Sequence, residues 1–198
     1  MRELRRQALH FAGVAFIPLA WVVGTYYSAL TALAFSLLFS LLSDRKHSKG
    51  KLHDFEVFLH KAFKHFERRD GKKLYEGVVY FFLGIGLSLL LLPHFSEKAA
   101  FLAVAVLSVY DSFSAIVGYY LGAHRVSFHK SKTWEGFLGG VLASSFFCLT
   151  LATPPVAVLV SLLGGFAEVA PFKLNDNVLI PLVVGLALLG LNLAGVAF

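Results

Sequence analysis

Apolar residues occur along this chain in long runs, and short polar segments separate the runs. A helix needs about 20 mostly apolar residues to cross a bilayer. Seven runs approach that length, at residues 8–24, 26–42, 75–92, 99–122, 134–152, 155–170 and 177–197. The breaks at 24–27 and 153–155 allow only tight turns, and both six and seven crossings fit the pattern. The pattern therefore predicts an all-α integral membrane protein with about seven transmembrane helices.

The composition agrees with this prediction and excludes an ordinary soluble domain. Of the 198 residues, 57% are hydrophobic and only 15% are charged, and the mean hydropathy is +0.71. Cys148 is the only cysteine, so an intrachain disulfide and a cysteine-based metal site are excluded. No separate soluble domain fits between the runs, and we expect a single domain over residues 1–198.

Positive charge is concentrated in one polar segment, residues 44–73. This segment holds ten Lys and Arg against five Asp and Glu, which gives +5 of the whole chain's +6. Short basic loops stay on the cytoplasmic side of a membrane. Seven crossings then bring the 123–133 loop and the 170–177 turn to the same side. We therefore expect the polar motifs to gather at the cytoplasmic face.

The basic segment also carries an apolar stripe. Its large apolar residues recur at three- and four-residue spacing: Leu52, Phe55, Leu59, Phe63 and Phe66. This spacing predicts an amphipathic helix at about 44–74 that lies in the membrane surface, with its basic face toward lipid phosphates.

Carboxylates at membrane depth, or at the cytoplasmic ends of the apolar runs, are the first candidates for chemistry. Asp111 lies inside an apolar run, where a charge costs about 2.5–3.5 kcal/mol. Glu76, Glu135, Glu168 and Asp176 complete this group. Oxygen ligands of this kind suit Mg²⁺, which takes one or two carboxylates together with substrate phosphates. A salt bridge for Asp111 and a helix cap for Asp176 are open alternatives.

The segment 129–136 has the pattern of a loop that enters a helix, with Thr133 as the N-cap. A helix N-terminus binds anions through its unpaired N–H groups. Lys130 and Lys132 add positive charge, and Ser131 adds a hydroxyl group. Lysines also mark cytoplasmic loops that bind nothing, so the loop alone does not decide. Together with the carboxylates, it indicates phosphate chemistry at the membrane surface.

Taken in order, these segments resemble the integral-membrane polyprenol (dolichol) kinases, together with phytol/farnesol kinases and CTP-dependent diacylglycerol kinases. More distantly, they resemble the phosphatidate cytidylyltransferases. The segments that carry the resemblance are spread over most of the chain, at residues 3–10, 67–77, 108–122, 130–136 and 168–182. The loop Ser131-Lys-Thr-Trp-Glu-Gly-Phe137 is closer to the cytidylyltransferases, but their downstream signature is absent. The Asp176-Asn177 ending and the small size favour the kinases.

The resemblance implies transfer of a phosphoryl group from CTP to a long-chain isoprenoid alcohol, with Mg²⁺ as cofactor. It implies catalytic roles for Asp111, Lys132 and Glu168, and a Mg²⁺ site at Asp111, Asp176 and Asn177. The implied nucleotide-binding residues are His129, Lys130, Ser131, Lys132, Thr133, Glu135 and Gly136. The implied substrate-binding residues are Arg6, His10, Glu76 and Ser114.

Two other functions stay open. A CTP-dependent cytidylyltransferase that makes a CDP-activated lipid would use the same residues plus an anion pocket, which Arg68, Arg69 or Arg125 would supply. A non-enzymatic lipid or ion transporter would use the carboxylates as a relay. No nucleic acid is expected as a partner. The identity of the alcohol, the choice between monomer and homodimer, and the choice between a prokaryotic plasma membrane and the endoplasmic reticulum do not follow from the sequence.

Overall fold

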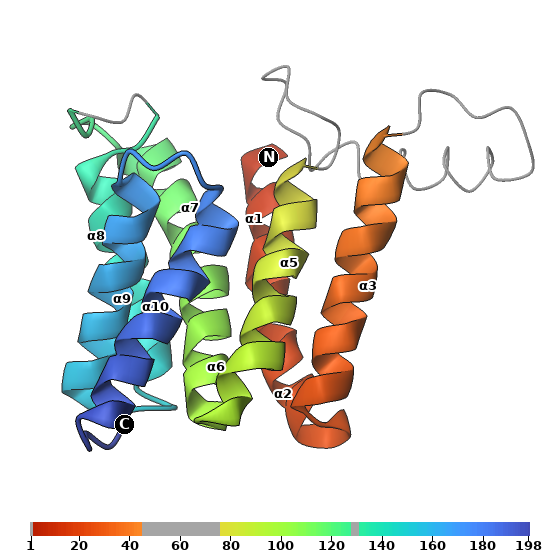
Figure 1. Ribbon diagram of the computed structural model, residues 1–198. Helices are drawn as coiled ribbons and strands as arrows, with labels where there is room; N and C mark the ends of the chain where they lie inside the picture. Colours follow the sequence, from red (N-terminus) through yellow and green to blue (C-terminus); the bar gives the residue numbers. More distant parts are fainter. Residues whose placement is uncertain (1, 45–75, 128–130) are drawn as a thin grey trace, which may run out of the picture.

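The computed structural model describes residues 2–44, 76–127 and 131–198, and in these ranges the chain is helical apart from its connections. Within these ranges seven helical rods follow one another, and each coincides with one of the predicted apolar runs (Figure 1). In chain order the rods are α1 (Arg2–Ala12), η1 (Gly13–Ala15) and α2 (Phe16–Val23); α3 (Thr25–Asp44); α5 (Glu76–Leu91) and η3 (Leu92–His94); α6 (Glu97–Ala105), the π-helix η4 (Val106–Tyr110) and α7 (Asp111–Leu121); α8 (Trp134–Cys148); α9 (Pro154–Val169); and α10 (Asp176–Leu193).

The rods have the character of a multi-pass membrane protein. Within the described residues, five stretches are long and apolar enough to cross a bilayer: Arg6–Val23, Thr25–Ser43, Glu76–His94, Glu97–Leu121 and Asp176–Leu193. Val22, Phe146 and Leu193 are 82%, 78% and 79% exposed, which is typical of a surface that faces lipid. The amphipathic helix expected at about 44–74 lies, apart from Asp44 at the end of α3, outside the described residues.

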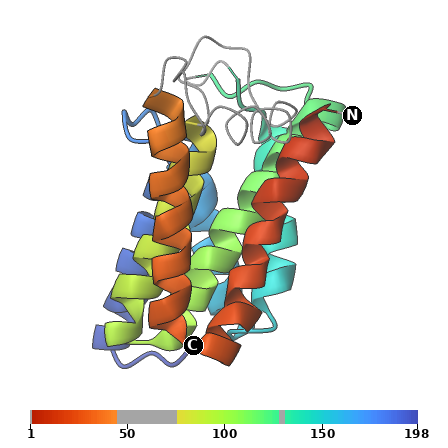
Figure 2. The same ribbon diagram turned by 90° about the vertical axis from the view of Figure 1, so that its right-hand side faces the viewer.

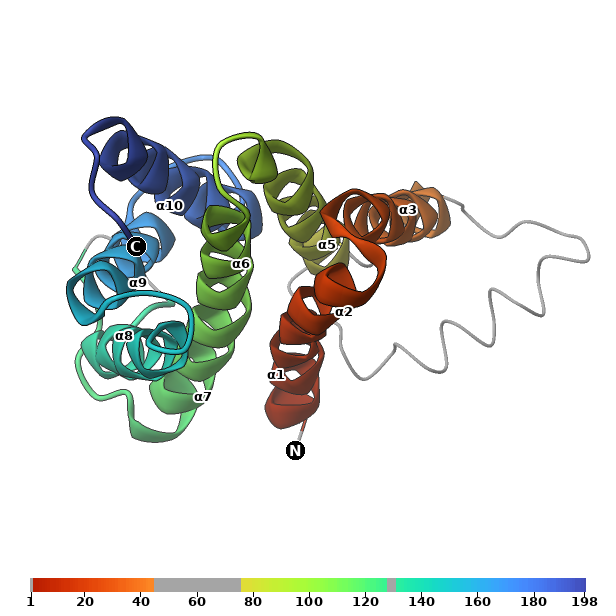
Figure 3. The same cartoon turned by 90° about the horizontal axis from the view of Figure 1, so that it is seen from below.

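The rod made of α6, η4 and α7 is the centre of the bundle. Seen along the bundle axis, it lies between a group formed by α8, α9 and α10 and a group formed by α1, α5 and α3 (Figure 3). In this rod 72% of the membrane-length window is buried, against at most 39% in the other four. The side chains from Ala99 to Leu107 are almost completely buried. The central rod therefore holds the core, and the other rods supply the surface.

The connections divide between the two ends of the bundle. The N-terminus, the α7–α8 connection and the α9–α10 connection lie at one end, and the C-terminus lies at the other (Figures 1 and 2). The described polar motifs thus gather at one end, as the pattern of crossings predicts.

A π-helical turn interrupts the central rod directly before Asp111. It spans Val106–Tyr110, and each of its side chains is buried. A π-helical turn accommodates one extra residue, so it changes the face on which the following side chains lie, and such turns are frequent at functional sites. Tyr110 and Asp111 therefore owe their direction to this turn.

Glycines let the neighbouring helices approach this part of the central rod. A Cβ at Gly140 of α8 or at Gly165 of α9 would lie 2.8 Å and 2.9 Å from Cε2 of Tyr110. A Cβ at Gly136 would lie 2.6 Å from the carbonyl oxygen of Ser114. Because no larger residue fits at these contacts, they hold α8 and α9 tightly against the segment that carries Asp111.

The packing of α5 against α10 predicts the effect of one substitution. A Cβ at Gly84 would overlap the main-chain carbonyl oxygen of Asn177, and a backbone atom cannot move aside as a side chain can. We expect Gly84→Ala to destabilise the protein by about 1–3 kcal/mol. The midpoint of thermal unfolding in detergent measures the change.

The matched control is Gly190→Ala in α10, where an added Cβ meets nothing within 4 Å. We expect its effect to stay within about 1 kcal/mol. Equal midpoints for Gly84→Ala and the unsubstituted protein would contradict the close approach of α5 and α10.

Candidate functional site

A pocket of about 360 Å³ opens at the end of the bundle that holds the polar connections. Helices α1, α7, α8 and α9 and the α7–α8 connection enclose it. Its walls are Arg6, Ser114, Ala115, Gly118, Tyr119, Gly122, Arg125, Ser131, Lys132, Thr133, Gly136, Phe137 and Glu168. Seven residues implied by the kinase resemblance are among them, together with Arg125 of the cytidylyltransferase alternative: Arg6, Ser114, Ser131, Lys132, Thr133, Gly136 and Glu168.

Lys132 joins the pocket to two carboxylates. Its Nζ atom lies 2.5 Å from Oε1 of Glu168 and 3.5 Å from Oδ2 of Asp176. The hydroxyl group of Ser114 donates a hydrogen bond of 2.8 Å to the same Oε1 atom. The ammonium group of Lys132 thus links the loop between α7 and α8 to both α9 and α10. The Oε1 atom of Glu168, which Ser114 also contacts, links α7 to the same group.

The surroundings of Lys132 keep it charged. Burial alone would lower the pKa of its ammonium group, but the carboxylates of Glu168, Asp176 and Asp111 outweigh burial and raise the pKa above its usual value. Lys132 therefore carries a full positive charge at neutral pH, at the edge of a pocket that Arg6 and Arg125 also border.

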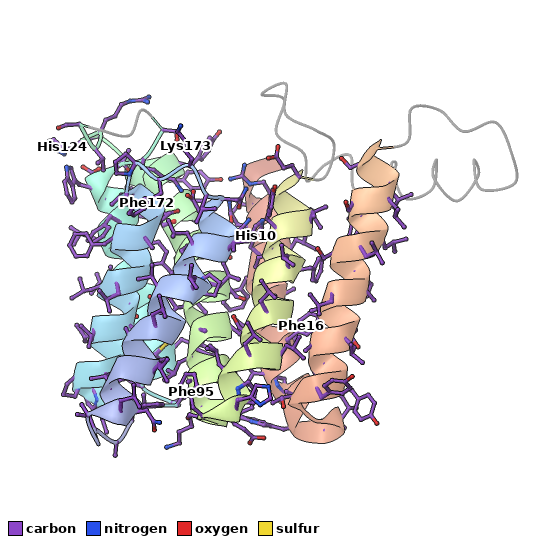
Figure 4. The ribbon with its side chains drawn as sticks, in the orientation of Figure 1. His10, Phe16, Phe95, His124, Phe172 and Lys173 are labelled. Atoms are coloured by element: carbon purple, nitrogen blue, oxygen red, sulfur yellow. The ribbon has the colours of Figure 1, made fainter. Side chains whose placement is uncertain are left out.

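Asp111 contacts a histidine of the first helix. Its Oδ2 atom lies 2.8 Å from Nδ1 of His10, at ion-pair distance but outside the angular range of an aligned hydrogen bond. The His10 ring packs on Phe81 with the ring centroids 4.4 Å apart. Figure 4 labels His10 in the half of the bundle that holds the polar connections, far from Phe95 at the other end. His10 of α1 is thus a partner of Asp111, whereas the alternative left open by the sequence was a salt bridge to a Lys or Arg.

The same interface brings Arg6 to the site. Arg6 and His10 are four residues apart in α1 and therefore lie on one face of that helix. The hydroxyl group of Ser112 donates to the carbonyl oxygen of Gln7 over 3.1 Å, which fixes α1 against α7. The predicted substrate-side residues Arg6, His10 and Ser114 are therefore brought together by the α1–α7 contact.

Thr133 is the N-cap of α8, as predicted. Its Oγ1 atom accepts a hydrogen bond of 3.2 Å from the N–H group of Gly136. The N–H group of Trp134 donates to the carbonyl oxygen of His124 over 2.9 Å. Two donors of the first turn, on which the predicted phosphate contact depends, are therefore used within the protein. The start of α8 therefore offers fewer unpaired N–H groups than the predicted phosphate contact requires.

The α7–α8 connection is fixed to its own helix by a second contact. Both carboxylate oxygens of Glu135 accept from the N–H group of His124 at 3.2 Å, and Oε1 also lies 2.6 Å from its Nδ1 atom. Glu135 consequently lies against the exposed His124, outside the pocket walls. The predicted nucleotide-binding residues His129 and Lys130 lie outside the described residues.

Asp176 and Asn177 are neighbours at the start of α10, but their side chains contact different parts of the protein. The N-cap is Asn175, whose side chain accepts from the N–H group of Asn177, so Asp176 is not needed as a cap and faces Lys132. The Nδ2 atom of Asn177 donates to the carbonyl oxygen of Gly77 over 3.1 Å and so connects α10 to α5. Glu76 begins α5 and has no ion pair or hydrogen bond within the described structure.

The predicted Mg²⁺ site is tested by the donor atoms that are present. Within residues 2–44, 76–127 and 131–198, no group of three or more His, Cys, Asp and Glu side chains is arranged to hold a metal ion. The ammonium group of Lys132 lies among the carboxylates instead. Mg²⁺ typically takes one or two carboxylates and completes its shell with water and substrate phosphates. Of the predicted ligands, Asp111 and Asp176 are 16% and 37% exposed at their side chains, whereas the side chain of Asn177 donates to Gly77.

Sequence reasoning missed Tyr110, His124 and Asn175. Tyr110 is fully buried, its hydroxyl group has no aligned hydrogen-bond partner in the described structure, and the charge of Glu168 acts on it. In the sequence, its position directly before Asp111 was the feature that could have indicated a role for Tyr110. Asn175 is the N-cap of α10, a role that the sequence analysis gave to its neighbour Asp176 as an alternative, and His124 contacts Glu135 through its N–H group and its ring.

Comparison of the chain with protein-family models, with curated proteins and with solved structures gave no match. The function must therefore be argued from the chemistry of the site and from the resemblance in the sequence.

The raised pKa of Lys132 predicts slow reaction with amine-modifying reagents, because only the neutral amine reacts. At about pH 9 we expect Lys132 to be acetylated more slowly by acetic anhydride than the exposed Lys173. Glu168→Gln should speed the reaction at Lys132, because the substitution removes a carboxylate that holds its pKa high. Mass spectrometry of peptides measures both rates.

The rate at Lys173 is the internal control and should be the same in both proteins. A rate at Lys132 that Glu168→Gln does not change would contradict the ion pair between Lys132 and Glu168.

Proposed function

We propose that the protein is a membrane-embedded kinase that transfers the γ-phosphoryl group of CTP to the hydroxyl group of a long-chain isoprenoid alcohol. The reaction takes place at the cytoplasmic face of a bundle of seven crossings. The observation that carries the proposal is the position of Lys132, which borders a cationic pocket on one side and contacts Glu168 and Asp176 on the other. CTP and the isoprenoid alcohol are contributed by the resemblance in the sequence.

The charge of the pocket supports a polyphosphate as its ligand. Three cationic side chains, Arg6, Arg125 and Lys132, border it with one carboxylate, Glu168. Catalysis of phosphoryl transfer consists mainly of positioning the reactants and neutralising charge. Arginine and lysine do this for phosphate oxygens through charge-assisted hydrogen bonds. A volume of about 360 Å³ lies within the range of small-molecule sites.

The carboxylates supply the other half of the chemistry. Asp111 and Asp176 would hold Mg²⁺, which neutralises charge on the transferred phosphoryl group. The charges of both carboxylates stabilise the ammonium group of Lys132, and this residue also borders the pocket. His10 fixes the direction of Asp111 from α1. The rods expose apolar side chains along their length, so an acceptor with a long apolar tail can present its hydroxyl group at the polar end.

Nucleotidyl transfer is the second candidate, and Arg125 is the observation that favours it. Formation of a CDP-activated lipid from a lipid phosphate requires room for a second anion, and Arg125 adds a cation to the pocket beyond Lys132 and Arg6. The loop Ser131–Phe137 also resembles the cytidylyltransferases. A lipid or ion transporter is the third candidate. The gathering of Asp111, Glu168, Asp176 and Lys132 at one end of the bundle favours surface chemistry over transport.

Label transfer by purified protein distinguishes these candidates. CTP labelled on the α- or the γ-phosphate is offered with Mg²⁺ and with polyprenol, diacylglycerol or phosphatidate in detergent. We expect γ-label in the polyprenol and release of CDP. Transfer of α-label to phosphatidate with release of pyrophosphate would establish the cytidylyltransferase instead. No transfer from CTP, ATP or GTP to any acceptor would exclude both enzymes.

Asp111→Asn tests the carboxylate proposed to hold Mg²⁺. The amide keeps the shape of the side chain but lacks the charge, so we expect activity to fall by at least about 10²-fold. Yield and thermal midpoint should stay near those of the unsubstituted protein.

The control for this substitution is Glu97→Gln, which neutralises an exposed carboxylate at the start of α6, at the opposite end of the bundle. Full activity of Asp111→Asn would remove Asp111 from the proposed Mg²⁺ site.

A further inference from the structure

The three carboxylates around Lys132 differ in how much of each side chain a substrate can reach. Glu168 is only 2% exposed, whereas Asp111 and Asp176 are 16% and 37% exposed. A general base must come within hydrogen-bond reach of the proton that it accepts. The chain thus offers two accessible carboxylates for substrate and metal, and one that is almost entirely enclosed by protein.

The contacts of Glu168 explain why the enclosed carboxylate is tolerated. Its Oε1 atom accepts from both the Ser114 hydroxyl group at 2.8 Å and the Lys132 ammonium group at 2.5 Å. A buried charge is stable only when it is paired and hydrogen-bonded. Both donors come from residues that themselves border the pocket. Glu168 borders the pocket as well, but its carboxylate is 2% exposed and is directed at these two donors.

Lys132 is restrained at its backbone as well. Its carbonyl oxygen accepts from the N–H group of Val126 over 3.0 Å, and the side chain of Val126 is buried in the core. An ammonium group has three donor hydrogens. Glu168 accepts one of them, Asp176 lies at ion-pair distance from the same nitrogen atom, and Lys132 also borders the pocket. A flexible four-carbon side chain thereby acquires one fixed position.

We infer that Glu168 is a positioning residue: together with Ser114 it holds the Lys132 ammonium group at the pocket wall, where that group binds a polyphosphate. Glu168 is not the group that accepts the proton of the acceptor alcohol. The inference rests on the proposed function for the identity of the ligand. It assigns a positioning role to Glu168 and Ser114, and contact with the reactants and Mg²⁺ to Lys132, Asp111 and Asp176.

The test uses substitutions that leave the charge of the site unchanged, because loss of a negative charge would by itself favour an anionic ligand. Glu168→Asp shortens the side chain by one methylene group, so that its carboxylate no longer reaches Ser114 and Lys132 together. Ser114→Ala removes only the hydroxyl group. Glu97→Asp, at the opposite end of the bundle, is the matched control. Calorimetry on the full-length protein in detergent measures the Kd of CTP and of inorganic tripolyphosphate, both with Mg²⁺.

We expect Glu168→Asp to weaken the binding of both probes by about tenfold, and Ser114→Ala to weaken it by a smaller factor. In a Lys132→Ala background, Glu168→Asp should weaken binding no further, because its effect passes through the lysine. At saturating CTP, kcat should change by less than the Kd. If Glu168→Asp does not fold, Ser114→Ala tests the same link with a smaller change.

A general base would behave differently. Glu168→Asp would then lower kcat by about 10²-fold or more with the Kd of both probes unchanged, and this result would overturn the inference. Equal losses from Glu168→Asp with and without Lys132 would overturn it too. The label-transfer experiment tests the proposed function separately. If the protein binds tripolyphosphate through Lys132 but transfers no label, the kinase proposal is wrong and the positioning role of Glu168 stands.

Discussion

A carboxylate enclosed in a bundle of apolar helices must be paired with a cation, and at this site Lys132 is paired with Glu168. The pairing constrains much of the surrounding structure. It requires the α7–α8 connection to reach α9, and it requires α7 to bring Ser114 to the same oxygen atom. The glycines at positions 136, 140 and 165 permit that approach, because a larger residue at any of them would collide with α7 or with Tyr110. The tight packing at this end of the bundle and the charge at the edge of its pocket therefore have a common origin.

The positions of the helices along the chain were predictable from the sequence because they follow the apolar runs, whose lengths can be counted. The N-cap at Thr133 was predictable for a similar reason, since a cap is a local interaction between residues three apart. The gathering of Lys132, Glu168 and Asp176 was expected from the order of crossings and from the resemblance together. Such expectations concern which residues reach one end of the bundle, and they do not specify which atoms meet.

The direction of individual side chains was not predictable. Asp176 and Asn177 are neighbours, yet one faces Lys132 and the other donates to Gly77, because Asn175 rather than Asp176 caps α10. Glu135 was expected at the nucleotide, but its carboxylate lies against His124, where it contacts both the backbone N–H group and a ring nitrogen. These outcomes depend on hydrogen bonds between residues that adopt their relative positions only after the helices pack.

The π-helical turn before Asp111 makes the site sensitive to the deletion of a single residue in the central rod. An α-helix advances by about 100° of rotation per residue, so the extra residue within Val106–Tyr110 sets the rotation of every side chain that follows it in the central rod. Loss of one residue there would let the rod continue as a regular α-helix, but Asp111 and Ser114 would turn away from His10 and Glu168. A deletion in this turn would separate the two halves of the site without removing a single one of its polar residues.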